Sequence, residues 1–262
     1  MTPPSPLFFL KVPCVVHWGW KLNIVPFSKS RPPLVVPPPS SLIGALAYPL
    51  GRLLRFPETR GNLSWAESLR RGLVYVGLRV DAPLVPYFDL NRIHFFYRGK
   101  EKSDAVAVGK TYVLSVSRFP PTITLCYVAD LGRVEEALGC VDARNVLVEA
   151  AWGITRVGSR ESLVSPLEVV FGEARVVSEV RRGETAFSFM KKAAAAVDGA
   201  FIVEEVVDWE LTEIGDYGHA GREVLVVPYD EEEKRSKPVA VVVSSGYSFV
   251  DVGGELVVAR VG

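Results

Sequence analysis

Forty-two valines are spread through this 262-residue chain, and they strongly limit what it can fold into. A β-branched side chain is stiff at its first torsion angle and packs well on a pleated sheet, so valine favours strands over helices. The valine-rich segments are short, and Gly, Pro or charged residues separate them. The sequence therefore predicts a protein built mainly of β-sheet, with a few helices covering the sheets.

The first half of the chain alternates strand and helix signals. Apolar runs predict strands at 7–20, 73–80, 122–128 and 146–150, and helices at 41–47 and 131–138. Ser40 or Ser41 should cap the first helix, Pro49 should bend or end it, and Asp130 should cap the second. This order is the βαββαβ arrangement of ferredoxin-like domains. RNA-recognition modules share it, but so do many unrelated proteins, so the arrangement alone does not assign a function.

Two departures from this order indicate how the chain is divided. A long polar and aromatic segment, 86–118, interrupts it between the second and third strands. After residue 160 the pattern changes to short strands with one helix at 186–197. We therefore expect an α+β fold with two domains. A ferredoxin-like (RRM-like) N-terminal domain spans 1–160 and carries the insertion, and a β-rich C-terminal domain spans 161–262.

Charge is distributed unevenly although the formal net charge is zero. Residues 1–120 hold 16 basic and 6 acidic residues, a net charge of +10, whereas residues 121–262 hold 14 and 24, a net charge of −10. A basic half attracts polyanions even when the whole protein is neutral. The insertion also mixes basic residues with aromatic ones, which supplies cations for phosphates and rings for bases. The alternative is that these basic side chains are only solvated surface.

Residues 37–46, PPPSSLIGAL, form a first motif at the start of the first predicted helix. The prolines stiffen the approach to the helix, and free amides in its first turn attract anions. Gly44 lets the helix pack closely against a neighbour. A rigid connection without any ligand is the alternative interpretation of this motif.

Residues 152–165 form a second motif in which Arg156 and Arg160 flank Gly158. Glycine permits backbone conformations that aim successive amides at one anion, and arginine binds phosphate through two donors. Thr155, Ser159 and Ser162 add hydroxyl groups. The segment is not a Walker loop, because the Gly-Lys-Ser/Thr ending is missing. A glycine turn with solvated arginines is the alternative.

In this order and spacing, both motifs resemble those of the Cas-five family of CRISPR-associated proteins, in particular its archaeal subtype I-A branch. That family typically shows Pro-Pro-Ser-(Ser/Thr)-Leu-Ile-Gly-Ala-Leu before its first helix, and Gly-Ser-(Lys/Arg)-Glu-Ser-Leu-Val-Ser after its N-terminal domain. The matching segments here are Pro38–Leu46 and Gly158–Ser165. The segment 75–80, followed by 86–90, is also similar. The resemblance covers residues 7–165, and the rest only loosely.

The resemblance implies a RAMP-superfamily protein with a β-hairpin thumb, which we assign to 86–118. Such a protein is a non-catalytic subunit of the Cascade effector complex in antiviral defence, and it caps the complex by gripping the 5′ handle of the CRISPR RNA. The implied partners are CRISPR RNA, the Cas-seven backbone subunit and the large subunit, while target DNA is reached indirectly through guide pairing. Our candidate RNA-binding residues are Lys29, Arg31, Arg92, Arg98, Lys100, Lys102, Arg156, Ser159 and Arg160. Lys29 and Arg31 rest on charge and position alone.

A nuclease is the rival interpretation, because some members of the family in another subtype cleave precursor CRISPR RNA without metal. That reaction needs a base, an acid and a cation on the phosphate. Of the three histidines, only His94 lies in the basic insertion, near Tyr97 and Lys100. We expect His17 to be packed in the first strand, and His219 lies among acidic residues that repel RNA. A third possibility is a protein-binding spacer whose acidic C-terminal half docks on a basic partner.

The remaining signals concern metals, membranes and temperature. Cys14, Cys126 and Cys140 are too widely spaced for a zinc site and lie among apolar residues, so we expect inert thiols, no metal and no cofactor. No apolar run is long enough to cross a membrane and no signal peptide is evident, so we expect a cytoplasmic protein. The absence of Gln and the presence of only four Asn favour a thermophilic protein, although a GC-rich genome produces the same bias.

Overall fold

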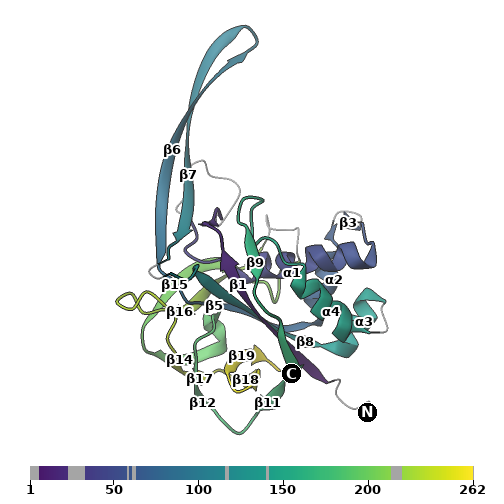
Figure 1. The fold of residues 1–262 in the computed structure, drawn as a ribbon. Helices are drawn as coiled ribbons and strands as arrows, with labels where there is room; N and C mark the ends of the chain where they lie inside the picture. The colour runs from purple at the N-terminus through teal and green to yellow at the C-terminus, as the bar shows by residue number, and fades with distance from the viewer. Residues whose placement is uncertain are drawn as a thin grey trace.

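The structure, a computed structural model, describes residues 6–22, 33–57, 59–60, 63–115, 118–139, 142–213 and 220–261 (Figure 1). It is a mixed α/β protein, rich in strands and with few helices. Its central sheet is antiparallel, in the order β10–β1–β8–β5, and β9 also pairs with β1. The bounds are β1 Leu7–Val16, β5 Leu73–Val80, β8 Thr122–Asp130, β9 Val164–Pro166 and β10 Val170–Glu173.

The strands β1, β5 and β8 are buried on both faces of the central sheet, which explains why they are almost continuously apolar. On one face, Leu10 of β1 and Leu125 of β8 pack in the cluster that also holds the helices. On the other face, Phe9 and Cys126 pack against strands from the C-terminal part of the chain. Successive side chains of a strand point to opposite faces of the sheet, so neighbouring residues pack alternately against the helices and against the C-terminal strands.

Four helices lie together beside one face of this sheet: α1 Pro39–Leu54, α2 Ala66–Gly72, α3 Leu131–Leu138 and α4 Ala143–Trp152 (Figure 1). The expected serine cap of the first helix is wrong, because α1 begins at Pro39 and no side chain caps it. Pro49 does not end this helix, whose apolar face is buried on both sides of that proline. The expected cap of α3 is confirmed, since the Asp130 carboxylate accepts a hydrogen bond from the Arg133 amide at 3.0 Å.

Two segments form a different kind of secondary structure from the one that the sequence predicted. Residues 146–150 belong to α4 rather than to a strand, because Asp142 caps the segment and Leu147, Ala150 and Ala151 form a buried helical stripe. The strands that complete the sheet beside β1 are β9 and β10 instead. Residues 186–197 contain β13 (Phe189–Met190), a 3₁₀ turn and β14 (Ala194–Asp198) rather than a helix. The alanine run extends as a strand because β14 pairs with β17 (Val239–Val243).

The C-terminal part forms small three-stranded sheets on the other side of the central sheet (Figure 1). Their further strands are β11 Arg175–Val177, β12 Arg182–Thr185, β15 Phe201–Val207, β16 Arg222–Pro228, β18 Tyr247–Asp251 and β19 Leu256–Arg260. Because β9 and β10 lie beyond residue 160 and pair with β1, strand pairing crosses the division expected at that point. The two-domain boundary itself stays a prediction.

The expected insertion is a long β-hairpin that projects from the body of the molecule (Figure 1). It consists of β6 (Leu84–Tyr97) and β7 (Lys100–Val113). Arg98 and Gly99 form its two-residue turn with φ of 51° and 72°, which is typical of a type I′ turn. At its base, β7 pairs with the short strand β2 (Gly19–Trp20).

Two minor observations complete the fold. The short strands β3 (Thr59–Arg60) and β4 (Leu63–Ser64) pair with each other between α1 and α2. Within the part of the chain that the structure describes, no helix is long and apolar enough to cross a membrane.

Candidate nucleic-acid interface

The two motifs that the sequence singled out meet at one cleft. Its volume is about 270 Å³, and its lining includes Ser40, Ser41 and Gly44 from the start of α1 and Arg156 and Gly158 from the second motif. The first turn of α1 contains no acidic residue, so the positive end of the helix dipole is not offset there. A guanidinium group and a helix N-terminus at the same cleft favour an anionic ligand.

Backbone conformation and packing both require glycine at Gly158. Its φ is +95°, and a β-carbon there would lie 2.3 Å from Cδ2 of Leu22. The turn is closed by hydrogen bonds from the Val157 amide to the Ser162 carbonyl (2.9 Å) and from the Ser162 amide to the Ser159 carbonyl (3.1 Å). The hydroxyls of Ser159 and Ser162 lie 2.7 Å apart. The predicted site residue Ser159 therefore helps to hold the shape of the turn.

The two arginines of the second motif keep their charge available. Arg156 stacks over the ring of Tyr48, with its guanidinium carbon 4.8 Å from the ring centroid. Arg160 is exposed. Within the described ranges, neither arginine forms an ion pair with a carboxylate. Both guanidinium groups therefore keep donors that no carboxylate of the described residues uses, and their role in binding phosphate stays a prediction.

Tyr48 is a residue of the site that sequence reasoning missed. It is 43% exposed and lies one helical turn after Gly44 on the outer face of α1. An exposed aromatic ring beside an arginine offers a stacking surface for an unpaired base. Its helical spacing from Ser41 and Gly44 was the signal available in the sequence.

The second motif is anchored to the segment that follows β1. The indole Nε1 of Trp18 donates a hydrogen bond to the Glu161 carbonyl, and His17 Nε2 lies 2.8 Å from the hydroxyl of Ser165. The expectation that His17 is packed in the first strand is wrong, since it is exposed just beyond β1. These contacts fix the glycine turn relative to the central sheet.

The predicted thumb cations are distributed over both faces of the hairpin. Tyr97 is opposite Lys100 and Phe95 is opposite Lys102, so these four residues share one face. The cations of Arg98 and Lys102 lie 5.2 Å and 5.0 Å from the centroid of the Tyr97 ring. The tip therefore carries an exposed cluster of cations and aromatic rings.

The nuclease interpretation required three residues that the hairpin does not bring together. His94 is an even-numbered position of β6 and pairs with Ser103, whereas Tyr97 pairs with Lys100. Side chains alternate along a strand, so His94 and Arg92 face away from Tyr97 and Lys100. The structure thus separates the proposed base from the proposed acid and cation.

The cysteines have the inert environment that the sequence suggested. Cys14 and Cys126 are buried and free. Burial raises the pKa of the Cys14 thiol to about 12 and that of Cys126 higher still, so both remain protonated. Among the described side chains, no group of three or more His, Cys, Asp or Glu is placed to hold a metal ion. Lys29, Arg31, Cys140 and His219 lie outside the described residues.

A largely buried carboxylate holds the segment 33–36 that leads into α1. Glu204 of β15 accepts hydrogen bonds from the amides of Val35 and Val36, the second at 3.2 Å. The same segment is held by Trp20 Nε1, which donates to the Val35 carbonyl (3.0 Å), and by the Thr111 hydroxyl, which donates to the Leu34 carbonyl (2.8 Å). Burial nevertheless raises the pKa of Glu204 to about 7.

Glu204→Gln should flatten the pH dependence of stability. The folded-state pKa lies above the ordinary value of 4.5, so the folded protein holds this proton more tightly, and wild-type stability falls as pH rises from about 4.5 to about 7. The slope for one proton reaches at most about 1.4 kcal/mol per pH unit. Urea unfolding across this range measures it. Glu205→Gln, at an exposed neighbour, should retain the slope, and an unchanged slope in Glu204→Gln would contradict the assignment.

Comparison with known proteins bears first on the class of protein. No protein-family model matches the chain. Its structure is similar to the crystal structure of a CRISPR protein from Archaeoglobus fulgidus, with a TM-score of 0.65 and 18% identity over 97% of this chain and 100% of that one. At this identity the likeness shows a shared fold.

Curated sequences identify the particular family that the chain resembles. It is 29% identical over 264 residues to the CRISPR-associated protein Cas5 3 of Saccharolobus solfataricus. It is 28% identical over 263 residues to the CRISPR system aCascade subunit Cas5 1 of the same organism. Each match covers 96% of this chain and 99% of the relative. The resemblance to the Cas-five family that the two motifs predicted is therefore confirmed over nearly the whole chain.

Proposed function

We propose that this chain is a Cas-five subunit of a subtype I-A Cascade complex, which binds the 5′ handle of the CRISPR RNA and caps one end of the complex without catalysis. The observation that carries the proposal is the cleft where the start of α1 meets the Arg156–Gly158 turn. A relative that is named as an aCascade subunit supports membership of such a complex.

The strand order supports the ferredoxin-like assignment. If β9 and β10 count as the fourth strand, the order β10–β1–β8–β5 is 4-1-3-2 in chain order, and all neighbours are antiparallel. α1 connects the first strand to the second, and α3 and α4 connect the third to the fourth. We infer a RAMP-type domain in which the hairpin, inserted between β5 and β8, is the thumb.

Single-stranded RNA offers phosphates and unstacked bases, and this surface has groups for both. Arg156 binds phosphate beside the start of α1, where Tyr48 supplies a ring, and Arg160 adds an exposed cation further along the same turn. The hairpin tip adds Tyr97 with its two cations. This combination favours RNA binding over the protein-binding spacer. The Cas-seven backbone subunit, the large subunit and, indirectly, target DNA follow as partners from the resemblance.

The non-catalytic part of the proposal rests on the separation of His94 from Tyr97 and Lys100 across the hairpin. Labelled repeat RNA incubated with the protein and a chelator should stay intact. A defined cut that disappears in His94→Ala would contradict the proposal and establish the metal-independent endoribonuclease instead.

Gly44→Leu should separate RNA binding from folding. A β-carbon at Gly44 meets nothing within 4 Å, so the expected close packing of the helix at this glycine is wrong, and a larger side chain attached there extends toward the cleft. Replacing glycine inside a helix is expected to stabilise the fold by about 0.5–1 kcal/mol. Blocking the cleft should weaken handle-RNA affinity about tenfold, the loss of one charge-assisted contact. Gly44→Ala is the matched control. It should give the same gain in fold stability but a smaller loss of affinity for the handle RNA. Unchanged affinity in Gly44→Leu would contradict the site.

A further inference from the structure

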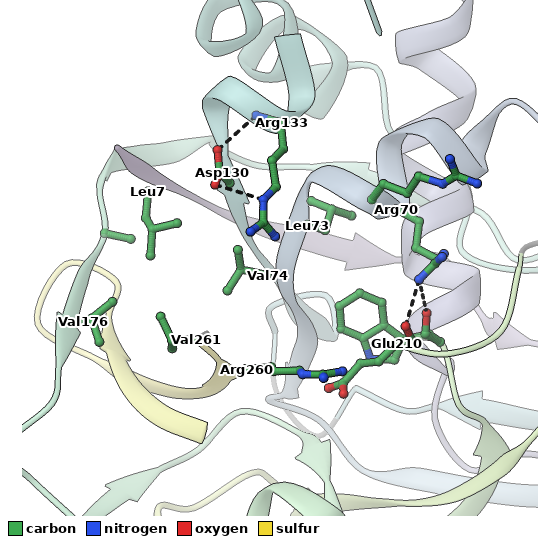
Figure 2. Close-up of a pocket in the computed structure, with 13 residues that line it drawn as sticks. Leu7, Arg70, Leu73, Val74, Asp130, Arg133, Val176, Glu210, Arg260 and Val261 are labelled. Carbon is green, nitrogen blue, oxygen red and sulfur yellow. Dashed lines mark hydrogen bonds and ion pairs between the residues drawn. The ribbon is translucent and has the colours of Figure 1, made fainter. Parts of the chain in front are cut away.

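A second cavity, of about 530 Å³, lies at the end of the central sheet away from the hairpin (Figure 2). Leu73, the first residue of β5, lines it, whereas the hairpin follows Val80, the last residue of that strand. Val176 and Arg260 close the cavity from the C-terminal sheets. Its volume is within the range of ordinary ligand pockets. The proposed RNA function does not use it.

The cavity has a mixed lining, in which aliphatic side chains stand between charged ones. Leu7, Leu73, Val74, Val176 and Val261 line it, and Figure 2 shows them on facing elements. Its aromatic lining residue, Trp209, is only 5% exposed and offers no open ring face. Such walls suit aliphatic side chains and give a nucleotide base nothing to stack on.

One of the arginines around the cavity, Arg70, uses its donors in hydrogen bonds within the protein. Arg70 binds both oxygens of the buried Glu67 carboxylate, at 2.7 Å and 2.6 Å. It also donates to the carbonyls of Trp209 and Glu210, at 3.1 Å and 3.0 Å. These bonds join α2 to the turn after β15, and they leave Arg70 no role in binding a ligand.

Arg71 is also paired, with Glu67 at 3.2 Å and Glu213 at 3.8 Å, whereas the other two arginines keep free donors. The side chain of Arg133 is 66% exposed, and within the described part of the chain it forms an ion pair only through Nε, with Asp130 at 3.4 Å. Arg260 is exposed at the end of β19, and no carboxylate in the described part of the chain pairs with it. A guanidinium group with free donors on an aliphatic wall binds carboxylates through paired hydrogen bonds.

The acidic residues of the rim are already neutralised by partners of their own. Asp130 caps α3 and pairs with Arg133. The Glu210 carboxylate accepts a hydrogen bond from the Tyr247 hydroxyl at 2.8 Å and lies 3.1 Å from the Lys192 ammonium. Four arginines and two carboxylates line the cavity (Arg70, Arg71, Arg133 and Arg260 against Asp130 and Glu210), so the formal charge of its lining is 4 − 2 = +2.

We propose that this cavity binds an extended acidic peptide segment of a partner protein. Alternating side chains of the segment place aliphatic groups against Val74 and Val176, and carboxylates on Arg133 and Arg260. A polypeptide fits better than a nucleic acid, because the aliphatic residues offer contacts to side chains and the cavity offers no open ring face on which a base could stack. This site is independent of the proposed RNA site.

The test uses a fluorescein-labelled peptide of alternating Val and Glu with a free carboxyl terminus, and the full-length chain. Fluorescence anisotropy should show binding to wild type, and binding at least about tenfold weaker to Arg133→Gln with Arg260→Gln. Arg182→Gln, an exposed arginine on β12, is the control for charge and should bind as wild type does. The isosteric Val–Gln peptide should bind at least about tenfold more weakly than the acidic peptide.

Equal binding by wild type and the double variant, or no binding by wild type, would overturn the proposal. Displacement of the peptide by short single-stranded RNA would also overturn it, in favour of a nucleic-acid surface. Val176→Asp provides a second variant, because a carboxylate inside the cavity pairs with the arginines and should reduce peptide binding without removing any of them. Thermal unfolding of each variant confirms that the chain remains folded, and handle-RNA affinity should not change in any of them.

Discussion

Replacing Arg156 and Arg160 together with alanine is expected to weaken handle-RNA binding about a hundredfold, because two charge-assisted phosphate contacts are lost. The dependence of affinity on salt should become shallower as well. Each phosphate contact on a single strand contributes about 0.7 to the slope of log affinity against log salt, through release of bound counterions. Filter-binding titrations of the handle RNA at several salt concentrations measure both effects.

Arg175→Ala with Arg182→Ala is the matched control, since it removes two exposed arginines from the C-terminal sheets. It should leave the slope and most of the affinity unchanged. Both double variants should unfold at nearly the wild-type temperature, because Arg156 and Arg160 form no ion pair with a carboxylate in the described structure, and the ion pair of Arg175 with Glu173, at 3.9 Å, is exposed. An unaltered salt slope in the first variant would contradict phosphate binding there and favour the protein-binding spacer.

Gly19→Ala is expected to destabilise the fold by about 3 kcal/mol or more, the combined cost of backbone strain and overpacking. The φ of Gly19 is +145°, and a β-carbon there would lie 2.0 Å from the carbonyl oxygen of Thr111. The obstacle is backbone, which no change of rotamer can remove. Gly19 pairs with Tyr112 at the base of the hairpin, so the substitution should also reduce RNA affinity by loosening the thumb. Urea unfolding measures the loss of stability.

Gly99→Ala is the control for backbone conformation alone. Gly99 has a φ of +72°, and a β-carbon there meets nothing within 4 Å. Gly99→Ala should lower the free energy of unfolding by about 1–2 kcal/mol, the penalty of placing an L-residue in the left-handed region. If Gly19→Ala cost no more than Gly99→Ala, close packing of β2 on β7 would not be what anchors the hairpin.

Elements with strong local signals agree with the sequence. β5 spans the predicted 73–80, and α3 spans the predicted 131–138 behind its Asp130 cap. In both, side-chain stiffness, capping and apolar pattern act within a few residues. The predictions for residues 146–150 and 186–197 were wrong for different reasons. The first segment is a helix behind the Asp142 cap, a local signal that the prediction missed, whereas the second extends as a strand because it pairs with the distant β17.

The candidate site was predictable in part. Arg156, Gly158 and Arg160 stood out because glycine between two arginines is itself a local pattern. Tyr48 did not, because only contact with Arg156 distinguishes it from any exposed tyrosine on a helix. The cations of the insertion could be named from the sequence, but their division between the two faces of the hairpin depended on the register of β6 against β7.

The sequence by itself determined where strands dominate, where the long basic insertion lies and which two motifs carry unusual chemistry, since these follow from local stiffness, turn residues and charge. Only the tertiary structure decided that the two motifs share one cleft, that His94 faces away from Tyr97, and that two cationic residues from α3 and β19 meet at a second cavity. The physical reason is that each of these depends on pairing and packing between segments far apart in the chain, whose energies no local pattern encodes.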